Sequence, residues 1–353
     1  MSREYLNGVF FSAGFHACYD RRMHSARVLS ATRFRAVFLT GAALTLVAGA
    51  TCAADYPVKP VRFIVALAPG GGTDFVARVL AGRLSETWGQ QVVVDNRPGA
   101  GSIIGAELVA KAVPDGYTLL LGTNSLLTQP SLFKNLPYDV TKDFAPVTLA
   151  LRAPLLLTAH PSLGVANLKE LIVLARAKPG ELSYASPALA TTGHLGGELF
   201  KLVTRVDIVH VPFKGAGIAI ASLLAGEVKL MYSSPPAVVM HVKAGRLRAL
   251  GVTGSKRAAQ APEIPTFEES GVNGVEAYDS YGVLAPARTP RAIVARLNAK
   301  IIEALNTPEI VNRFAVTQFA EVVGSTPEEF QRFMLAEVAR WAKVIRDANI
   351  RAE

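Results

Sequence analysis

From Val61 onward, short apolar runs alternate with stretches in which apolar residues recur every three or four positions. The runs at 61–67, 91–95 and 117–121 are rich in Val, Leu and Ile and have the length of buried strands. The stretches between them have the spacing of amphipathic helices, and Pro and Gly mark the turns. The same alternation continues from residue 168 to residue 252. It predicts an α/β protein with mainly parallel sheets.

Two long extended segments, 147–159 and 276–285, bracket the middle of the chain. Helices predicted at 290–305 and 327–348 follow the second segment. We expect these helices to complete the first unit, so that the middle unit is inserted into it. Two α/β lobes joined by two hinge strands form a clamshell with a cleft. The predicted division is residues 55–156 with 283–353 for lobe 1, and residues 157–282 for lobe 2.

The first 54 residues have the features of an export leader with a signal peptide. A basic flank at Arg33 and Arg35 precedes an apolar run, 36–50, and small residues follow it. The run is shorter than the roughly 20 residues that a membrane helix needs. We therefore expect cleavage after Ala54 and export to the periplasm.

Both cysteines, Cys18 and Cys52, lie in this leader. Without it, the exported part has no thiol for a disulfide, a metal site or nucleophilic attack. Lipidation at Cys52 is the alternative, although Gly49 stands where a large aliphatic residue is expected. A typical signal would begin at Met23, which would make residues 1–22 an upstream start artefact.

Composition excludes several classes of function. Half of the 353 residues are hydrophobic, 18% are charged and the net charge is +9, which suits a globular protein. No basic run is interleaved with aromatic residues, so we expect no nucleic-acid partner. The glycines of RPGAGSIIG lack dinucleotide-binding spacing, the histidines lack metal-ligand spacing, and no G-x-S-x-G is present. We expect no cofactor, no metal and no catalytic residue, and the protein is predicted not to be an enzyme.

The most informative loop follows the first predicted strand. Pro69 and three glycines, Gly70, Gly71 and Gly72, interrupt the apolar run, and Thr73 then has the residue type of a helix N-cap. Backbone N–H groups at the positive end of a helix can hold a small anion. Asp74 lies in the first helical turn, where it can pair with Arg78 four residues later. A glycine turn that only allows close packing is the alternative reading of this loop, and a capping role is the alternative for Asp74.

Further polar residues follow other predicted strands, at the sheet edge where ligands bind in α/β proteins. Those expected to contact a carboxylate are Asn124, Ser125, Ser186, Thr191, Thr192 and Ser233. Plain turns at the ends of strands are the alternative interpretation. His194, at the start of a helix, is more typical of a packed histidine than of a catalyst.

The order of several segments resembles the Bug receptors, periplasmic solute-binding proteins of tripartite tricarboxylate transporters. The segments are YPVKPVRFIVALAPGGGTDFVAR, VVVDNRPGAGSIIGA, PDGYTLLLGTN, TGHLGGELF, VPFKGAG, AGRLRALGVT, PEIPTFEESG and APARTP. The resemblance implies a periplasmic-binding-protein-like Venus flytrap and ligand contact through the loop 69–73. It implies capture of a dicarboxylate, a tricarboxylate, an acidic amino acid or an aromatic acid, and delivery to membrane subunits of the transporter.

The chain departs from the family pattern at several positions. Ala188 and Ala190 stand where glycines are usual, and Ser233 stands where an acid is common. A tryptophan is usual near Ser280. These changes predict a stiffer second loop and a cleft that is less acidic and less aromatic.

The function predicted from the sequence is that of a monomeric periplasmic receptor for a small carboxylate. One alternative is a ligand-sensing receptor for a sensor kinase. The other is an exported α/β hydrolase that would use Ser186 or His194. Binding without chemistry is the function that these loops favour.

Overall fold

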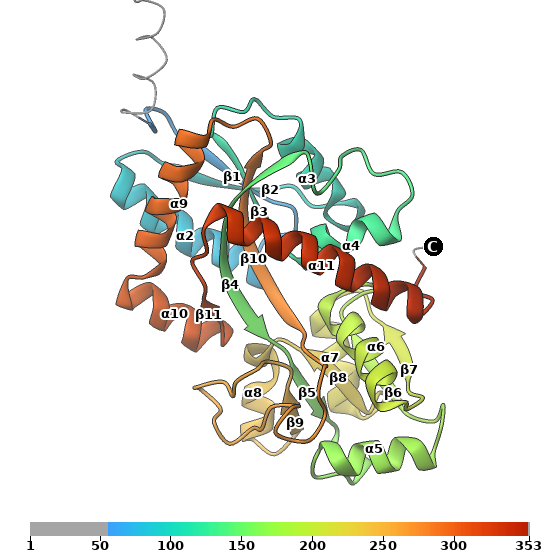
Figure 1. Cartoon of the computed structure of the whole chain (residues 1–353). Coiled ribbons are helices and arrows are strands. Elements are labelled where there is room, and N and C mark those ends of the chain that lie inside the picture. The colour runs from blue at the N-terminus through green and yellow to red at the C-terminus, as the bar shows by residue number, and fades with distance from the viewer. Residues whose placement is uncertain (1–55, 352–353) are drawn as a thin grey trace, which may run out of the picture. The chain divides into compact units, whose positions relative to one another are not determined.

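The computed structural model describes residues 56–351, so the predicted leader lies outside the described residues. The strands form two sheets (Figure 1). The first has the order β11-β4-β10-β3-β1-β2 and the second the order β7-β6-β8-β5-β9. The strands of the first sheet are β1 (Val61–Val65), β2 (Val92–Asn96), β3 (Thr118–Gly122), β4 (Phe144–Pro154), β10 (Tyr278–Pro286) and β11 (Glu321–Val322). Those of the second are β5 (Leu156–Ala159), β6 (Ser183–Ser186), β7 (Val209–Pro212), β8 (Leu230–Ser233) and β9 (Arg248–Val252).

Each sheet contains parallel and antiparallel pairs. β1 pairs in parallel with β2 and β3, and β6 pairs in parallel with β7 and β8. The strands that connect the two halves run the other way: β10 is antiparallel to β3 and β4, and β5 is antiparallel to β8 and β9. The prediction of mainly parallel sheets is therefore wrong for the connecting strands, because each enters its sheet from the opposite end.

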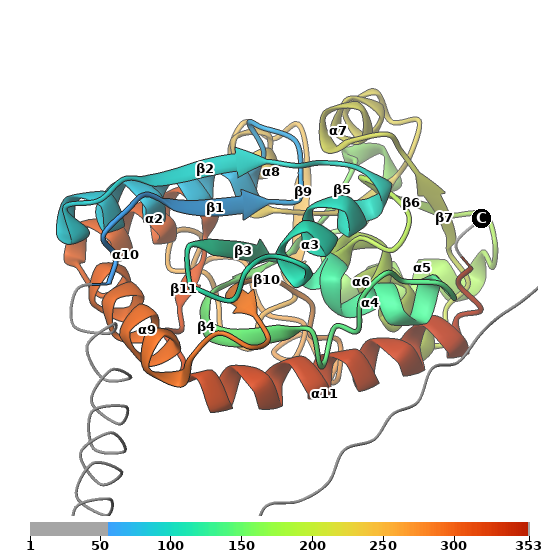
Figure 2. The same cartoon turned by 90° about the horizontal axis from the view of Figure 1, so that it is seen from above.

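Helices cover both faces of the first sheet (Figure 2). They are α2 (Gly72–Trp88), α9 (Arg291–Leu305) and α10 (Pro308–Gln318) on one face, and α3 (Ile103–Ala110), α4 (Asn124–Leu132) and α11 (Pro327–Asp347) on the other. Alternate residues of β1 explain this, since Phe63 and Val65 pack toward α2 and α9 while Ile64 packs toward α3. The C-terminal helices α9, α10 and α11 thus all pack on the first sheet.

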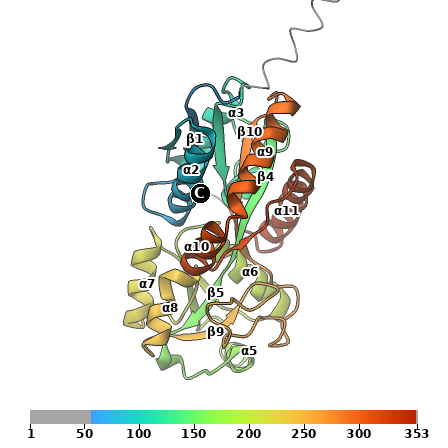
Figure 3. The same cartoon turned by 90° about the vertical axis from the view of Figure 1, so that its left-hand side faces the viewer.

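The second sheet is covered in the same way (Figure 3). Its helices are α5 (Leu168–Ala177) and α6 (Thr192–Thr204) on one face, and α7 (Ala216–Ala225) and α8 (Pro235–Lys243) on the other. Helix α6 lies so close to β6 that a Cβ on Gly197 would be 2.2 Å from the Tyr184 ring. Only glycine permits this approach.

The two predicted crossings are β4 with β5 and the segment that leads into β10. The chain changes sheet at Leu155, between β4 and β5, and returns to the first sheet at Tyr278. Trp341 of α11 is fully buried and packs with Leu195 of α6. Trp341 therefore packs where the first lobe meets the second.

One local prediction is wrong, and two helices were not predicted. Helix α2 begins at Gly72 with Gly71 as its N-cap residue, so Thr73 does not cap it. The residues after β3 form helix α4, although Pro130 lies inside it. Helix α10 was not predicted either. No helix among residues 56–351 is both long and apolar enough to span a membrane.

Candidate functional site

Four helices are the next elements after the carboxyl ends of neighbouring strands. α2 follows β1, α4 follows β3, α6 follows β6 and α8 follows β8. In the first sheet β1 pairs in parallel with β3, and in the second β6 pairs in parallel with β8. The helix starts that follow the strands of one sheet therefore lie at the same edge of that sheet. The positive ends of the helix dipoles, with unpaired N–H groups, are the ends that face this edge.

The glycine loop, residues 69–71, leads into α2. Gly70 has a φ of +85°, which a glycine adopts without strain. The first hydrogen bond of the helix runs from the Phe75 N–H to the Gly71 carbonyl at 3.0 Å. The N–H groups of Gly72 and Thr73 therefore have no carbonyl partner within the helix. Gly70, Gly71 and Gly72 are exposed and Thr73 is buried, so the loop presents backbone rather than side chains.

Asp74 holds the glycine loop in shape. Its Oδ2 accepts from the Gly70 N–H at 3.0 Å and from the Arg78 Nε at 2.9 Å, which confirms the predicted pair. The Arg78 hydrogen bond lowers the pKa of the buried carboxyl, with the Gly70 N–H acting in the same direction. Oδ2 of Asp74 is thus occupied within the protein, as the capping interpretation expects, whereas Oδ1 is buried without a hydrogen-bond partner.

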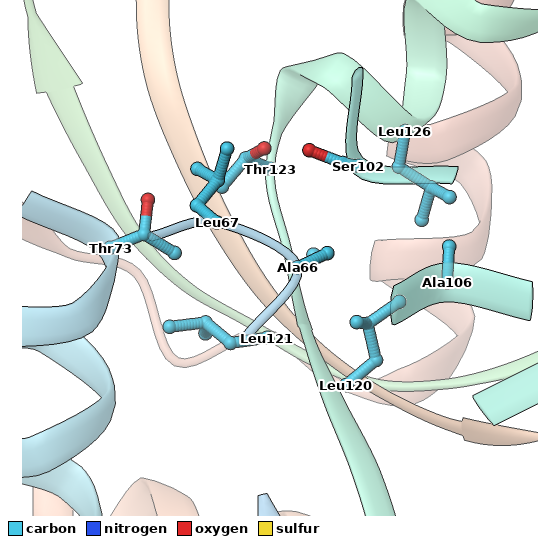
Figure 4. Close-up of a pocket in the computed structure, with 10 residues that line it drawn as sticks. Ala66, Leu67, Thr73, Ser102, Ala106, Leu120, Leu121, Thr123 and Leu126 are labelled. Atoms are coloured by element: carbon cyan, nitrogen blue, oxygen red, sulfur yellow. The ribbon is translucent and has the colours of Figure 1, made fainter. Parts of the chain in front are cut away.

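A small hollow of about 10 Å³, the space that one water molecule needs, lies next to this loop. Its lining is mainly apolar but includes three residues with hydroxyl groups, Thr73, Ser102 and Thr123 (Figure 4). Figure 4 shows the hydroxyls of Ser102 and Thr123 pointing toward one another. Ser102 is buried and its Oγ has no hydrogen-bond partner. The α2, α3 and α4 starts thus share one hollow, which offers donors to a polar group.

Asn124 ties the start of α4 to the rest of the site. Its Nδ2 donates to the Tyr278 carbonyl at 2.5 Å and approaches the Thr192 Oγ1 at 3.4 Å, and its Oδ1 accepts from the Ser280 N–H at 3.3 Å. The buried amide is used within the protein, and it joins the two lobes. Ser125, beside it, is half-buried.

The alanine loop, residues 187–191, leads into α6. Ala190 has a φ of +57°, unusual for alanine, and its N–H donates to the Nδ1 of His194 at 2.9 Å. Thr191 donates its hydroxyl to the Ala188 carbonyl, whereas Thr192 is buried at the first helical position. As in α2, the N–H groups of the first helical turn have no carbonyl partner within the helix.

His194 stacks on His210, with ring centroids 3.7 Å apart and planes 10° from parallel. Burial lowers the pKa of His194 to about 3 and that of His210 to about 4, so both rings are neutral near pH 7. His194 is therefore a packed histidine, as the sequence suggested. The neutral ring is required, because Nδ1 accepts the Ala190 N–H.

Ser186 is fully buried behind the alanine loop. Its Oγ donates to the Ala188 carbonyl at 2.8 Å and lies 2.7 Å from the His210 Nε2. A hydroxyl has one proton, so His210 is the donor in the second contact. A catalytic base must instead accept the serine proton. The pair therefore holds the loop and is not arranged for nucleophilic attack.

Ser233, Ser234 and Asp279 lie where β8 ends and β10 begins. The buried Ser233 Oγ has no partner, and the Ser234 hydroxyl donates to the Asp279 Oδ2 at 3.3 Å. α8 begins with Pro235 and Pro236, which have no N–H, so this helix start offers fewer donors than the others.

The structure brings a few of the predicted residues together with other polar groups. Thr73 shares the hollow with Thr123, and Asn124 joins Thr192. Pro69 lies on the exposed loop. Direct ligand contact stays a prediction for all of them. The sequence reading missed Ser102, Thr123, Ser234 and Asp279, because only tertiary contacts identify them.

Among the described residues, no group of three or more His, Cys, Asp or Glu side chains is arranged to hold a metal ion. The site offers hydroxyls, amides and helix dipoles. Such an arrangement binds a small anion by hydrogen bonds.

Comparison with known proteins gives the same picture. Residues 76–350 match the family model described as "Tripartite tricarboxylate transporter family receptor". The chain is 40% identical over 323 residues to protein BugT of Bordetella pertussis, covering 91% of this chain and 99% of BugT.

Two solved structures are similar throughout the described part. R. palustris Rpa4515 with adipate is 39% identical, with a TM-score of 0.75, and covers 84% of this chain and 100% of its own. MatC from Rhodopseudomonas palustris with bound malate is 32% identical, with a TM-score of 0.70, and covers 82% of this chain and 100% of its own. The two-lobe α/β fold is thus that of these binding proteins.

Proposed function

The chain belongs to the Bug family of tripartite tricarboxylate transporter receptors, and we propose that it is a periplasmic receptor that captures a small carboxylate. The observation that carries the proposal is the meeting of helix starts from both lobes at Asn124 and Thr192. The family is one of solute-binding receptors. The bound adipate and malate of Rpa4515 and MatC support a carboxylate ligand.

In this proposal the ligand carboxylate accepts hydrogen bonds from the start of α2, next to the glycine loop, on one side and from the start of α6 on the other. The N–H groups of Gly72, Thr73 and Thr192 are the first candidates, with Ser125, Thr191 and Ser233 as further contacts. The division into lobes 55–156 with 283–353 and 157–282 is part of the proposal. The lobes would close over the ligand by bending at β4 and β10.

The energy required is modest. Micromolar capture corresponds to about 8 kcal/mol. Each hydrogen bond to a charged group contributes about 1.5–3 kcal/mol, so a few such bonds supply much of the affinity. Closure would exclude water and strengthen them.

We propose further that the receptor acts as a monomer and delivers its ligand to the membrane subunits of a tripartite tricarboxylate transporter. Contact of the closed form with a sensor kinase is the alternative destination. Pull-down with and without ligand, from membranes that contain either partner, distinguishes the two.

The variant Gly71→Val tests the binding site. Gly71 has an extended backbone, and its added Cβ would have only the Ala68 carbonyl oxygen, at 3.9 Å, as a neighbour. Valine is therefore accommodated by the fold but covers the N–H groups beside it. We expect calorimetry against a panel of carboxylic acids to show at least a tenfold loss of affinity, about 1.4 kcal/mol.

Gly82→Val is the matched control. Gly82 lies in α2, the helix that Gly71 precedes, is exposed and has open space around its Cβ position. It should bind like the unmodified protein. Unchanged affinity in Gly71→Val, with both variants folded, would remove the glycine loop from the site.

A further inference from the structure

Asp279 is a carboxylate at the junction of the two lobes, in a site otherwise suited to anions. It belongs to β10, where its ladder partner is Ala153. The Ser234 hydroxyl, at the start of α8, donates to its Oδ2, and the Thr192 hydroxyl, at the start of α6, also bonds to it. Asp279 thus lies beside one of the helix starts to which the carboxylate of the ligand is assigned.

No ion pair in the part of the chain that the structure describes includes Asp279. The cation on the neighbouring strand, Arg152, is paired with Ser280, so it lies on the opposite face of the sheet. Its guanidinium stacks 3.8 Å above the Tyr278 ring. Asp279 is instead hydrogen-bonded by two neutral hydroxyl groups, those of Ser234 and Thr192.

An ionised carboxylate that is half-buried without a cation is costly. Burial raises the pKa of Asp279, against the opposing effect of the Thr192 and Ser234 hydrogen bonds. A positive group that arrived with the ligand would offset this cost.

A neighbouring polar group is left without a partner, and a second neighbour reaches the glycine loop. The Ser233 Oγ is buried without a partner. Tyr281, two residues beyond Asp279, lies on the same side of the strand, and its hydroxyl is 3.4 Å from the Cβ position of Gly72. Asp279 and the glycine loop therefore border the same region from two sides.

We propose that Asp279 selects the ligand by binding the ammonium group of an amino acid whose carboxylate is held at the helix starts. This inference rests on the proposed function and narrows it. The ligand class is a zwitterion with one carboxylate and one ammonium group. A dicarboxylate would place its second negative charge against Asp279 and bind more weakly.

Matched ligand pairs test this inference. 5-Aminopentanoate is adipate with one carboxylate replaced by an ammonium group, and 3-aminopropanoate is related to succinate in the same way. Alanine and propanoate form a third pair, which differs by an ammonium group on the α-carbon. Calorimetry on the unmodified protein should give at least tenfold tighter binding for the ammonium member of at least one pair.

Asp279→Asn keeps an oxygen that accepts from Ser234 but removes the charge. It should reduce the preference for the ammonium member at least tenfold and improve dicarboxylate binding. Glu268→Gln, which neutralises an exposed carboxylate of the second lobe, is the control and should leave the preference unchanged.

The outcomes separate the two proposals. Tighter binding of the dicarboxylates by the unmodified protein overturns the role of Asp279 and leaves the receptor function standing, and this comparison does not depend on the variant. An unchanged preference in folded Asp279→Asn also overturns it. If no carboxylate of the panel binds at all, the proposed function itself fails.

Discussion

The glycine loop of lobe 1 and the alanine loop of lobe 2 have the same backbone design and different chemistry. In each, a residue with positive φ lies two positions before the first helical residue, Gly70 in one and Ala190 in the other. Its N–H donates to the side chain four residues later, Asp74 at 3.0 Å or His194 at 2.9 Å. The third helical residue thus holds the loop that precedes it.

The two loops differ in how the side chain that accepts the loop N–H, here called the anchor, is stabilised. Asp74 is charged and pairs with Arg78, whereas His194 is neutral and stacks on His210. The two lobes therefore present similar N–H groups, but Asp74 and His194 take up protons in different pH ranges. The comparison shows that one loop geometry can be fixed by an ion pair or by a buried neutral ring.

The largest expected effect is on stability at low pH. The folded-state pKa values of His194 and His210, about 3 and about 4, lie below the value near 6.5 for an unfolded histidine. Below pH 6.5 the unfolded state binds more protons, so stability falls as the pH falls from 6.5 toward 4. We expect a loss of about 2–5 kcal/mol between pH 7.5 and 4.5, measured by urea unfolding.

Asp74 behaves differently. Its folded-state pKa lies below its unfolded value, so its contribution is complete above about pH 4 and is lost only as the pH falls through the folded value. His194→Asn should therefore flatten the profile between pH 6.5 and 4. An equally steep profile in that variant would contradict the assignment of the acid sensitivity to the alanine loop.

The next largest effect is expected from removal of the charged anchor. Asp74→Ala removes the acceptor of the Gly70 N–H and the partner of Arg78. Lost hydrogen bonds to a charged group predict a decrease of about 1.5–3 kcal/mol in the free energy of unfolding, with weaker ligand binding. Asp74→Asn keeps the acceptor and should lose less, and equal losses in the two variants would argue against the loop contact.

Removal of the neutral anchor should cost less. His194→Phe keeps a ring for the stack on His210 but leaves the Ala190 N–H without its acceptor. The expected loss is about 1 kcal/mol in urea unfolding. His194→Asn, whose Oδ1 can take the place of Nδ1, should restore most of it. No recovery would mean that the ring, and not the hydrogen bond, stabilises the loop.

The smallest effects concern the residues with positive φ. Gly70→Ala introduces a Cβ where φ is +85° and should cost about 1 kcal/mol, although nothing lies within 4 Å of that Cβ. Ala190→Gly relieves strain and adds unfolded-state entropy, so its net effect should be below about 0.5 kcal/mol. Thermal unfolding of the two variants measures both, and a similar loss in each would mean that the loops do not differ in strain.

The alternation of apolar runs predicted the two α/β lobes, the two crossings and the loops after β1 and β6. The sequence did not predict α4 or α10, because α4 is short and contains Pro130, and a helix there depends on packing. The Asp74–Arg78 pair was predictable because it is local. Asp279 was not, since its partners Thr192 and Ser234 come from other elements far along the chain.

The most direct measurement is a crystal structure with a carboxylate bound at a concentration near its dissociation constant. The account predicts carboxylate oxygens within hydrogen-bond distance of the N–H groups of Gly72 or Thr73 and of the first turn of α6. A carboxylate bound away from both the glycine loop and the alanine loop would contradict it.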